Sequence, residues 1–137
     1  DGDVAGGVTA TQAESGVDAY MGVGGAAEGV LAAAALGCIG GQMQGRLVFG
    51  GDDEKKRAAA LGITELGRKY SAPEMAQGDL TFAATGVTGG AMLTGVRTFA
   101  GCAITHSMVL RSTTGTLRYV EAHRNFANEA RVQRTGA

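Results

Sequence analysis

The segment from Gly22 to Val30 holds the residue pattern with the clearest chemical potential. Glycines at positions 22, 24 and 25 precede a single carboxylate, Glu28, and an alanine-rich stretch follows. Because glycine has no Cβ, such a segment can turn tightly and lets a ligand approach the backbone closely. The pattern predicts a strand at 18–23, a glycine turn, and a buried helix at roughly 28–37.

Glu28 sits where a helix would begin, and two interpretations of it remain open. The first turn of a helix has unpaired N–H groups and a positive dipole end, which together favour a phosphate or another hard anion. A divalent metal that bridges the carboxylate and a phosphate would explain a negative charge there. Alternatively, Glu28 only complements the helix dipole, which is a common surface arrangement.

Asp1-Gly2-Asp3 is the second motif with possible chemistry, because two carboxylates flank a glycine. In a turn these carboxylates can converge on a cation or on sugar hydroxyls, and a solvated turn is the alternative. We expect this tripeptide in a loop at the end of a strand. That strand is absent from the sequence, which also lacks an initial Met, so we expect a fragment or a processed piece.

Three further polar residues are candidates of lower specificity. His106 has no nucleophile and acid partner beside it in the sequence, so we expect a hydrogen-bonded histidine in a strand. Arg111 and Arg118 flank a turn and could pair across it or meet a phosphate, and we expect the structural role.

The remaining pattern predicts an α/β fold with a mixed sheet, layered helices and an antiparallel C-terminal portion. Asp52 or Asp53 is expected to cap the third helix, and the tail from His123 onward is expected to be irregular. The expected helices are 4–11, 28–37, 54–62 and 73–78, and the expected strands are 18–23, 43–49, 79–87, 92–99, 103–112 and 116–120, with a hairpin turn at 112–115.

Composition excludes several classes of protein. The chain has 137 residues, which is one domain at most, and its 12 basic and 13 acidic residues form no basic stripe for nucleic acid. Cys38 and Cys102 have no metal-ligand spacing, so we expect buried free thiols in a reduced compartment. With no apolar run near the roughly 20 residues that span a membrane and no signal peptide, we expect a cytoplasmic protein that contacts no membrane.

A rival motif is Gly22-x-Gly24-x-x-Ala27, which fits a loose dinucleotide-binding fingerprint between a strand and a helix. That fingerprint expects an acidic residue about 20 positions later, at the end of a second strand. Gly50-Gly51-Asp52-Asp53 is a poor fit, so a dinucleotide-binding domain is the weaker alternative.

Five motifs in order resemble the class II fructose-1,6-bisphosphatases of the GlpX type, and the resemblance covers nearly the whole chain with matching spacings. They are Asp1-Gly2-Asp3-Val4, Gly24-Gly25-Ala26-Ala27-Glu28-Gly29-Val30, Gly40-Gly41-Gln42-Met43-Gln44-Gly45-Arg46-Leu47, Phe82-Ala83-Ala84-Thr85-Gly86-Val87-Thr88 and Thr105-His106-Ser107-Met108-Val109-Leu110-Arg111-Ser112.

The resemblance implies a sugar-phosphatase fold related to the inositol monophosphatases, of which residues 1–137 would form the C-terminal part with the N-terminal part absent. It implies hydrolysis of the 1-phosphate of fructose 1,6-bisphosphate to fructose 6-phosphate, a step of gluconeogenesis. Asp1, Gly2, Asp3 and Gly25 match positions that contact the sugar bisphosphate, and Glu28 matches a ligand of Mn²⁺ or Mg²⁺. The catalytic residues are expected in the absent part, so the isolated chain is expected to be inactive, and the complete protein is expected to be a homo-oligomer.

The chain departs from the family pattern at several positions. Ala27 stands where the family usually has proline, Gly89 where it has an acidic residue, and Gln42 where it has a charged one. Gly37 replaces the usual basic residue before Cys38. None of these is a known ligand. A second hypothesis is therefore a lobe without catalytic activity that binds sugar phosphate weakly or completes another chain.

Overall fold

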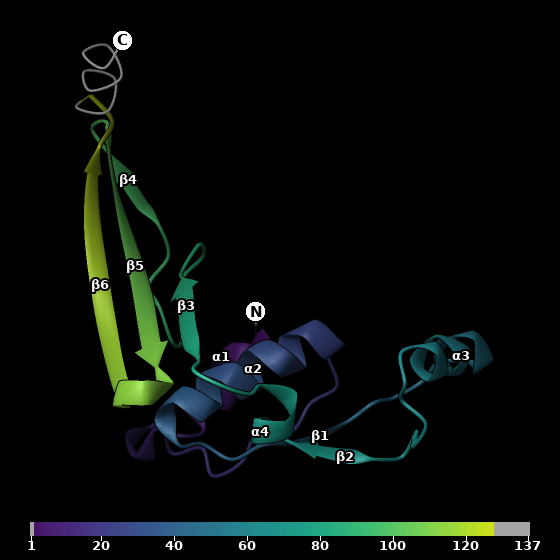
Figure 1. The fold of residues 1–137 in the computed structure, drawn as a ribbon. Coiled ribbons are helices and arrows are strands. Elements are labelled where there is room, and N and C mark those ends of the chain that lie inside the picture. The colour runs from purple at the N-terminus through teal and green to yellow at the C-terminus, as the bar shows by residue number, and fades with distance from the viewer. Residues whose placement is uncertain (1, 128–137) are drawn as a thin grey trace.

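The computed structural model describes residues 2–127 and has three parts: a helical layer, an antiparallel sheet that rises from it, and an arm that extends sideways (Figure 1). In chain order the elements are α1 (Gly2–Thr9), η1 (Ala13–Ser15), α2 (Ala26–Ile39), β1 (Gln44–Arg46), α3 (Asp52–Ala60), β2 (Lys69–Ser71), α4 (Ala72–Met75), β3 (Thr81–Thr85), β4 (Arg97–Phe99), β5 (Cys102–Arg111), η2 (Ser112–Thr114) and β6 (Thr116–Asn125).

The larger sheet is built around β5, which pairs with β3 and β4 along one edge and with β6 along the other. β5 and β6 form the predicted hairpin, and its turn ends at Gly115, which has φ 58°. Every strand pairing within residues 2–127 is antiparallel. The mixture of helices and strands is confirmed, whereas the prediction of a mixed sheet is wrong.

The core lies between α2 and the lower part of this sheet. Met108 and Leu110 of β5 are fully buried, and their cross-strand neighbours on β3 are Ala84 and Phe82. The alanines of α2 let the helix lie close to the sheet because they add little bulk. The buried cluster consists of Val4, Val8, Ala32, Ala35, Cys38, Phe82, Leu93, Met108 and Leu110.

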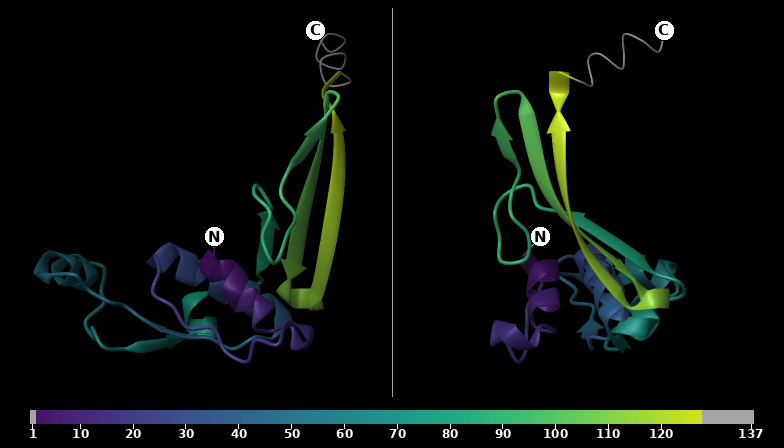
Figure 2. Two further views of the ribbon diagram at one scale, coloured as in Figure 1. Left: turned by 180° about the vertical axis from the view of Figure 1, so that it is seen from behind. Right: turned by 90° about the vertical axis from the view of Figure 1, so that its left-hand side faces the viewer.

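α1 packs along α2, and the two helices run side by side in the same direction (Figure 2). Thr11, just after α1, meets Gly41 and Leu36 at the end of α2, where a Cβ on Gly41 would lie 2.7 Å from the Thr11 methyl group. Because the C-terminal ends of the helices meet, their N-terminal ends point the same way. The predicted helices at 4–11 and 28–37 are both confirmed, and each begins two residues earlier.

The predicted strand at 18–23 is wrong. Residues 16–25 form an irregular exposed segment that leads from η1 to α2. The aromatic ring of Tyr20 lies over Gly6 of α1, so close that a Cβ on Gly6 would collide with it, and Met21 is 92% exposed. The apolar run 19–21 therefore contacts α1 through Tyr20 and belongs to neither of the described sheets.

The loop predicted for Asp1-Gly2-Asp3 is also contradicted, since Gly2 is the first residue of α1 and Asp3 follows within it. Asp1 and the side chain of Asp3 lie outside the described part of the structure.

The arm consists of the two-stranded pairing of β1 with β2 and the polar helix α3 (Figure 1). The strand predicted at 43–49 is reduced to β1. Gly62, with φ 85°, ends the helical segment as expected, because its N–H bonds the Ala59 carbonyl at 3.0 Å.

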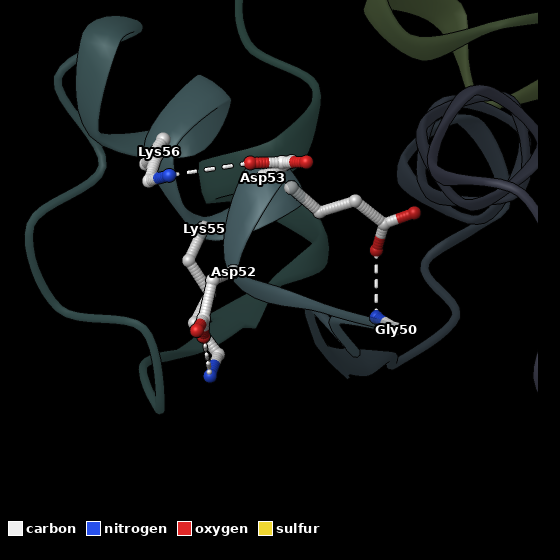
Figure 3. A network of polar contacts seen from close by, with 6 residues as sticks. Gly50, Asp52, Asp53, Lys55 and Lys56 are labelled. Atoms are coloured by element: carbon white, nitrogen blue, oxygen red, sulfur yellow. Dashed lines mark hydrogen bonds and ion pairs between the residues drawn. The ribbon is translucent and has the colours of Figure 1, made fainter.

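The expected aspartate cap of α3 is wrong. Gly51 occupies the cap position without a side-chain hydrogen bond. The aspartates pair with lysines one turn later, at 2.9 Å for Asp52–Lys55 and 3.3 Å for Asp53–Lys56, while a Glu54 oxygen accepts the Gly50 N–H at 2.7 Å (Figure 3). All these groups are exposed, so the charged residues of α3 form a solvated face.

α4 begins with a capping box. The N–H and hydroxyl of Ser71 both donate to Glu74, at 2.8 and 2.7 Å, and Pro73 stands in the first turn. Arg68 also contacts Glu74 at 2.7 Å. These bonds lower the pKa of Glu74 to about 2, chiefly through the Ser71 backbone and side chain.

Three strand boundaries differ from expectation. β3 is shorter than 79–87 and alternates in burial, because only one face of the strand meets the helices. The strand predicted at 92–99 is reduced to β4. β6 continues to Asn125 instead of ending at 120, so the irregular tail predicted from His123 is wrong for 123–125; residues 128–137 lie outside the described part.

Both thiols are free. Cys38 is buried as expected, and burial raises its pKa, whereas Cys102 is only half-buried. Within residues 2–127 no helix has the length and apolar character needed to cross a membrane.

Candidate functional site

The site predicted around Glu28 is the N-terminal end of α2. Gly25 is the cap residue, in an extended conformation, and it makes no side-chain cap bond. The first backbone bond of the helix runs from the Gly29 N–H to the Gly25 carbonyl at 3.1 Å. Glu28 therefore occupies the third helical position, from which a glutamate reaches back toward the cap.

The structure brings Gly25 and Glu28 together. The Glu28 carboxylate folds back so closely over Gly25 that a Cβ on this glycine would collide with Oε2. The backbone of Gly25, with φ −67° and ψ 148°, is one that any residue can adopt. The close contact at Gly25 comes from the end of the Glu28 side chain, which is half-buried and would have to move aside for a Cβ.

The first helical residue, Gly2, belongs to the helix that packs beside α2. α1 and α2 run in the same direction, and Thr11 meets Leu36 and Gly41 at their far ends. Of the residues predicted to bind substrate or metal, the structure therefore brings Gly25 and Glu28 together and places Gly2 on the neighbouring helix.

The N-terminal end of α2 is electrostatically suited to an anion. The positive end of the α2 dipole lies there, and the N–H groups of its first turn are free of helical partners. Glu28 supplies one carboxylate, the donor type that Mg²⁺ and Mn²⁺ prefer. However, residues 2–127 contain no group of three His, Cys, Asp or Glu side chains that could hold a metal. The donor type fits, and the number of donors falls short of a site.

His106 has the structural role that we expected. Its Nδ1 accepts the Thr94 N–H at 3.2 Å, and its ring stacks on Tyr119 with centroids 5.5 Å apart. Arg111 and Arg118 do not pair across the hairpin. Arg111 donates to Thr113 at 2.9 Å and Arg118 donates to Thr116 at 3.0 Å.

A charged cluster on β4 and β6 was missed by the sequence analysis. Glu121 accepts from Arg97 at 3.0 Å and contacts His123 at 2.7 Å, and His123 is the main cause of its lowered pKa. His106 is its cross-strand neighbour on β5. Pairing between distant strands creates this cluster, and no local sequence signal indicates it.

The glycine-rich segment after β3 folds back on itself. The Val96 N–H bonds the Val87 carbonyl at 3.1 Å, and the Gly90 N–H bonds the Leu93 carbonyl at 3.0 Å. A Cβ on Gly95 would lie 2.7 Å from the Gly89 nitrogen, so the two backbones approach too closely for a side chain. These glycines thus serve backbone packing.

Comparison with known proteins identifies the family of this chain. Residues 1–124 match the family model described as "Bacterial fructose-1,6-bisphosphatase, glpX-encoded". The chain belongs to this family. It is 40% identical over 134 residues to a "D-fructose 1,6-bisphosphatase class 2/sedoheptulose 1,7-bisphosphatase" of Synechococcus elongatus, with 88% of the chain and 39% of the relative covered. A protein of the same description from Trichodesmium erythraeum is 35% identical over 146 residues, with 97% and 42% covered. The chain therefore spans about two fifths of the length of these relatives.

Family membership and structure together remove the dinucleotide-binding alternative. That fingerprint requires a strand before Gly22, and residues 16–25 are irregular. It also requires parallel strands, whereas all pairings among residues 2–127 are antiparallel.

Proposed function

We propose that this chain forms part of a metal-dependent phosphatase that removes the 1-phosphate of fructose 1,6-bisphosphate. The observation that carries the proposal is the family match over residues 1–124, which includes every predicted site residue. The relatives are also described as sedoheptulose 1,7-bisphosphatases, so a seven-carbon bisphosphate is a second substrate to test. The fold proposed for the complete protein is the sugar-phosphatase fold, and the proposed location is the cytoplasm.

In this proposal the end of the helical layer binds and orients the substrate. The free N–H groups at the starts of α1 and α2 favour a phosphate or the polar sugar. Gly25 permits close approach of the ligand because it has no Cβ. Asp1 and Asp3 are proposed to accept hydrogen bonds from sugar hydroxyls.

Glu28 is proposed as one ligand of Mn²⁺ or Mg²⁺. A bound divalent ion activates water and neutralises charge that develops on phosphate oxygens. Glu28 alone cannot hold the ion, so the proposal requires other carboxylates from outside residues 2–127. The proximity of its carboxylate to Gly25 supports a shared role, because the proposed metal ligand and substrate contact then lie one helical turn apart.

The test replaces Glu28 with Gln in a chimera in which this chain substitutes for the segment that it matches in the Synechococcus elongatus relative. We expect Mn²⁺-dependent phosphate release to collapse, since the isosteric amide loses the negative charge. Glu14→Gln is the matched control, because Glu14 is exposed on η1, and it should keep its activity. Retained activity in Glu28→Gln would remove Glu28 from the proposed metal site.

A second candidate is a lobe without catalytic activity that binds sugar phosphate. It is favoured by the single carboxylate at the site and by the absence of a three-ligand group within residues 2–127. Calorimetry of the chimera with Mn²⁺ distinguishes the two. A tight, stoichiometric site in the chimera that Glu28→Gln removes would count against the second candidate, and a chimera without such a site would support it.

A further inference from the structure

His106 of β5 holds the segment 86–96, which connects β3 to β4 and which we call the β3–β4 loop (Figure 1). The backbone carbonyl of His106 accepts the Gly86 N–H at 3.0 Å, and its side-chain Nδ1 accepts the Thr94 N–H at 3.2 Å. One residue of the strand therefore contacts both ends of the loop. The first bond uses the main chain and does not depend on protonation, whereas the second uses a group that titrates.

The bond from Thr94 fixes the protonation state of the imidazole. A ring nitrogen accepts a hydrogen bond only when it carries no proton, so the ring of His106 is neutral and its single proton is on Nε2. A second proton would have to bind Nδ1, which would change this acceptor into a donor. Two N–H groups would then face each other, and the Thr94 N–H would lose its partner.

The surroundings of the ring allow this change of charge. The imidazole stacks on the Tyr119 ring of β6, with the centroids 5.5 Å apart and an angle of 21° between the planes. This contact orients the ring with respect to the β3–β4 loop. His106 is only half-buried, so solvent can supply and remove the proton.

The charged groups around His106 come from β4 and β6. Glu121 lies directly opposite His106 on β6, and its carboxylate contacts Arg97 of β4 at 3.0 Å and His123 at 2.7 Å. The hydrogen bond with His123 is the main cause of the lowered pKa of Glu121, so this carboxylate stays negative in the range in which an imidazole titrates. Neither β3 nor the β3–β4 loop contains an ionisable side chain.

Two opposing influences therefore act on His106. The negative charge of Glu121 favours the protonated imidazole, whereas the bond from Thr94 favours the neutral one. Because an ordinary histidine gains its second proton at about pH 6.5, a ring under opposing influences is suited to change its charge between pH 8 and pH 5.

We propose that His106 is a pH-dependent latch on the β3–β4 loop. The neutral imidazole holds the Thr94 N–H at pH 8, and protonation at pH 5 releases it. The release is local, because the Leu93 side chain is buried in the core at 6% exposure and the Gly86 bond to the main chain is unaffected. This inference does not depend on the proposed function.

Amide hydrogen exchange, measured by NMR on the 137-residue chain, tests the latch. The rates are compared as protection factors, since the intrinsic exchange rate itself changes with pH. We expect the protection factor of the Thr94 amide to fall at least fivefold from pH 8 to pH 5, which corresponds to the loss of about one hydrogen bond. The Gly86 amide, bonded to the carbonyl of the same histidine, should change less than twofold. Equal protection of Thr94 at the two pH values would overturn the proposal.

His106→Phe and His123→Phe are matched variants that separate the two histidines. Phenylalanine keeps a ring that can stack on Tyr119 but offers no acceptor to Thr94. At pH 8, we expect His106→Phe to lower Thr94 protection at least fivefold relative to the parent chain, with no further fall at pH 5. His123→Phe should retain the fall, because the His123 side chain is 63% exposed and contacts Glu121. If His123→Phe abolished the fall, the titrating group would be the His123–Glu121 pair and the latch would be refuted.

The titration of the ring identifies the group that gains the proton. The NMR signal of the His106 Cε1–H should titrate with the same midpoint as the fall in Thr94 protection, and midpoints that differ by a full pH unit would contradict the latch. Acid could instead loosen the whole sheet, and the Gly86 amide would then lose protection as well. In that case the comparison at pH 8 decides: a Thr94 amide equally protected in His106→Phe and in the parent chain would overturn the proposal.

Discussion

Gly25→Ala and Gly29→Ala should change stability in opposite directions, although the two glycines are one helical turn apart. A Cβ at position 25 would collide with the Glu28 carboxylate, whereas a Cβ at position 29 would meet nothing within 4 Å. Gly25 is the cap residue, and alanine is a much poorer cap than glycine, which costs about 1 kcal/mol. Gly29 lies inside α2, where alanine is favoured over glycine by about 0.5–1 kcal/mol.

Thermal unfolding of the 137-residue chain measures both effects. For a domain of this size, 1 kcal/mol shifts the Tm by about 3 to 5 °C. We expect the Tm to fall by roughly that amount for Gly25→Ala and to rise by a similar or smaller amount for Gly29→Ala. In the chimera, Gly25→Ala should also weaken Mn²⁺ binding, because the carboxylate is displaced.

Equal stability of the two variants would refute the reasoning. It would mean that the cap preference at position 25 and the helix propensity at position 29 do not act on stability as the structure requires.

Three further predictions concern packing and titration. Met108→Ala should destabilise the chain by about 2–5 kcal/mol, because Met108 is fully buried, whereas Met21→Ala at a 92% exposed position should be nearly neutral in chemical denaturation. The Glu74 carboxyl should titrate near pH 2 in NMR spectra instead of near 4.5. Its stabilising contribution is therefore present above pH 4.5 and is lost as the pH falls toward 2. Ser71→Ala should move the titration midpoint of Glu74 upward, and an unchanged midpoint would contradict the capping role of Ser71. Cys38 should react with iodoacetamide more slowly than Cys102, since burial removes it from the reagent and raises its pKa; equal rates by mass spectrometry would contradict its burial.

Elements with a strong local signal were predictable from the sequence. The alanine-rich run gives α2, and Gly40, with φ 77°, ends it. The hairpin around Gly115 follows from the turn residues between two apolar runs. In these segments local propensity and tertiary packing agree.

The errors arose where tertiary contacts overrule local pattern. The apolar run 19–21 looked like a strand, but Tyr20 packs on Gly6 instead. β6 looked as though it ended early, since Glu121, His123 and Arg124 are polar. Charged side chains are common on an edge strand, where one side faces water.

The candidate site could be predicted only in part. The spacing from Gly25 to Glu28 identified a glycine turn with a carboxylate, and the structure shows the two in contact. That α1 packs along α2 depends on tertiary contacts between the two helices, which sequence spacing does not reveal. The cluster of Arg97, Glu121 and His123 depends on cross-strand register in the same way.

The most direct test of the proposed function measures Mn²⁺-dependent phosphate release from fructose 1,6-bisphosphate by two proteins. One is the 137-residue chain alone, and the other is the chimera that joins it to the unmatched part of the Synechococcus elongatus relative. The account predicts release by the chimera and none by the chain, because Glu28 alone cannot hold the metal. Release by the chain alone, or a folded chimera that releases no phosphate, would contradict it.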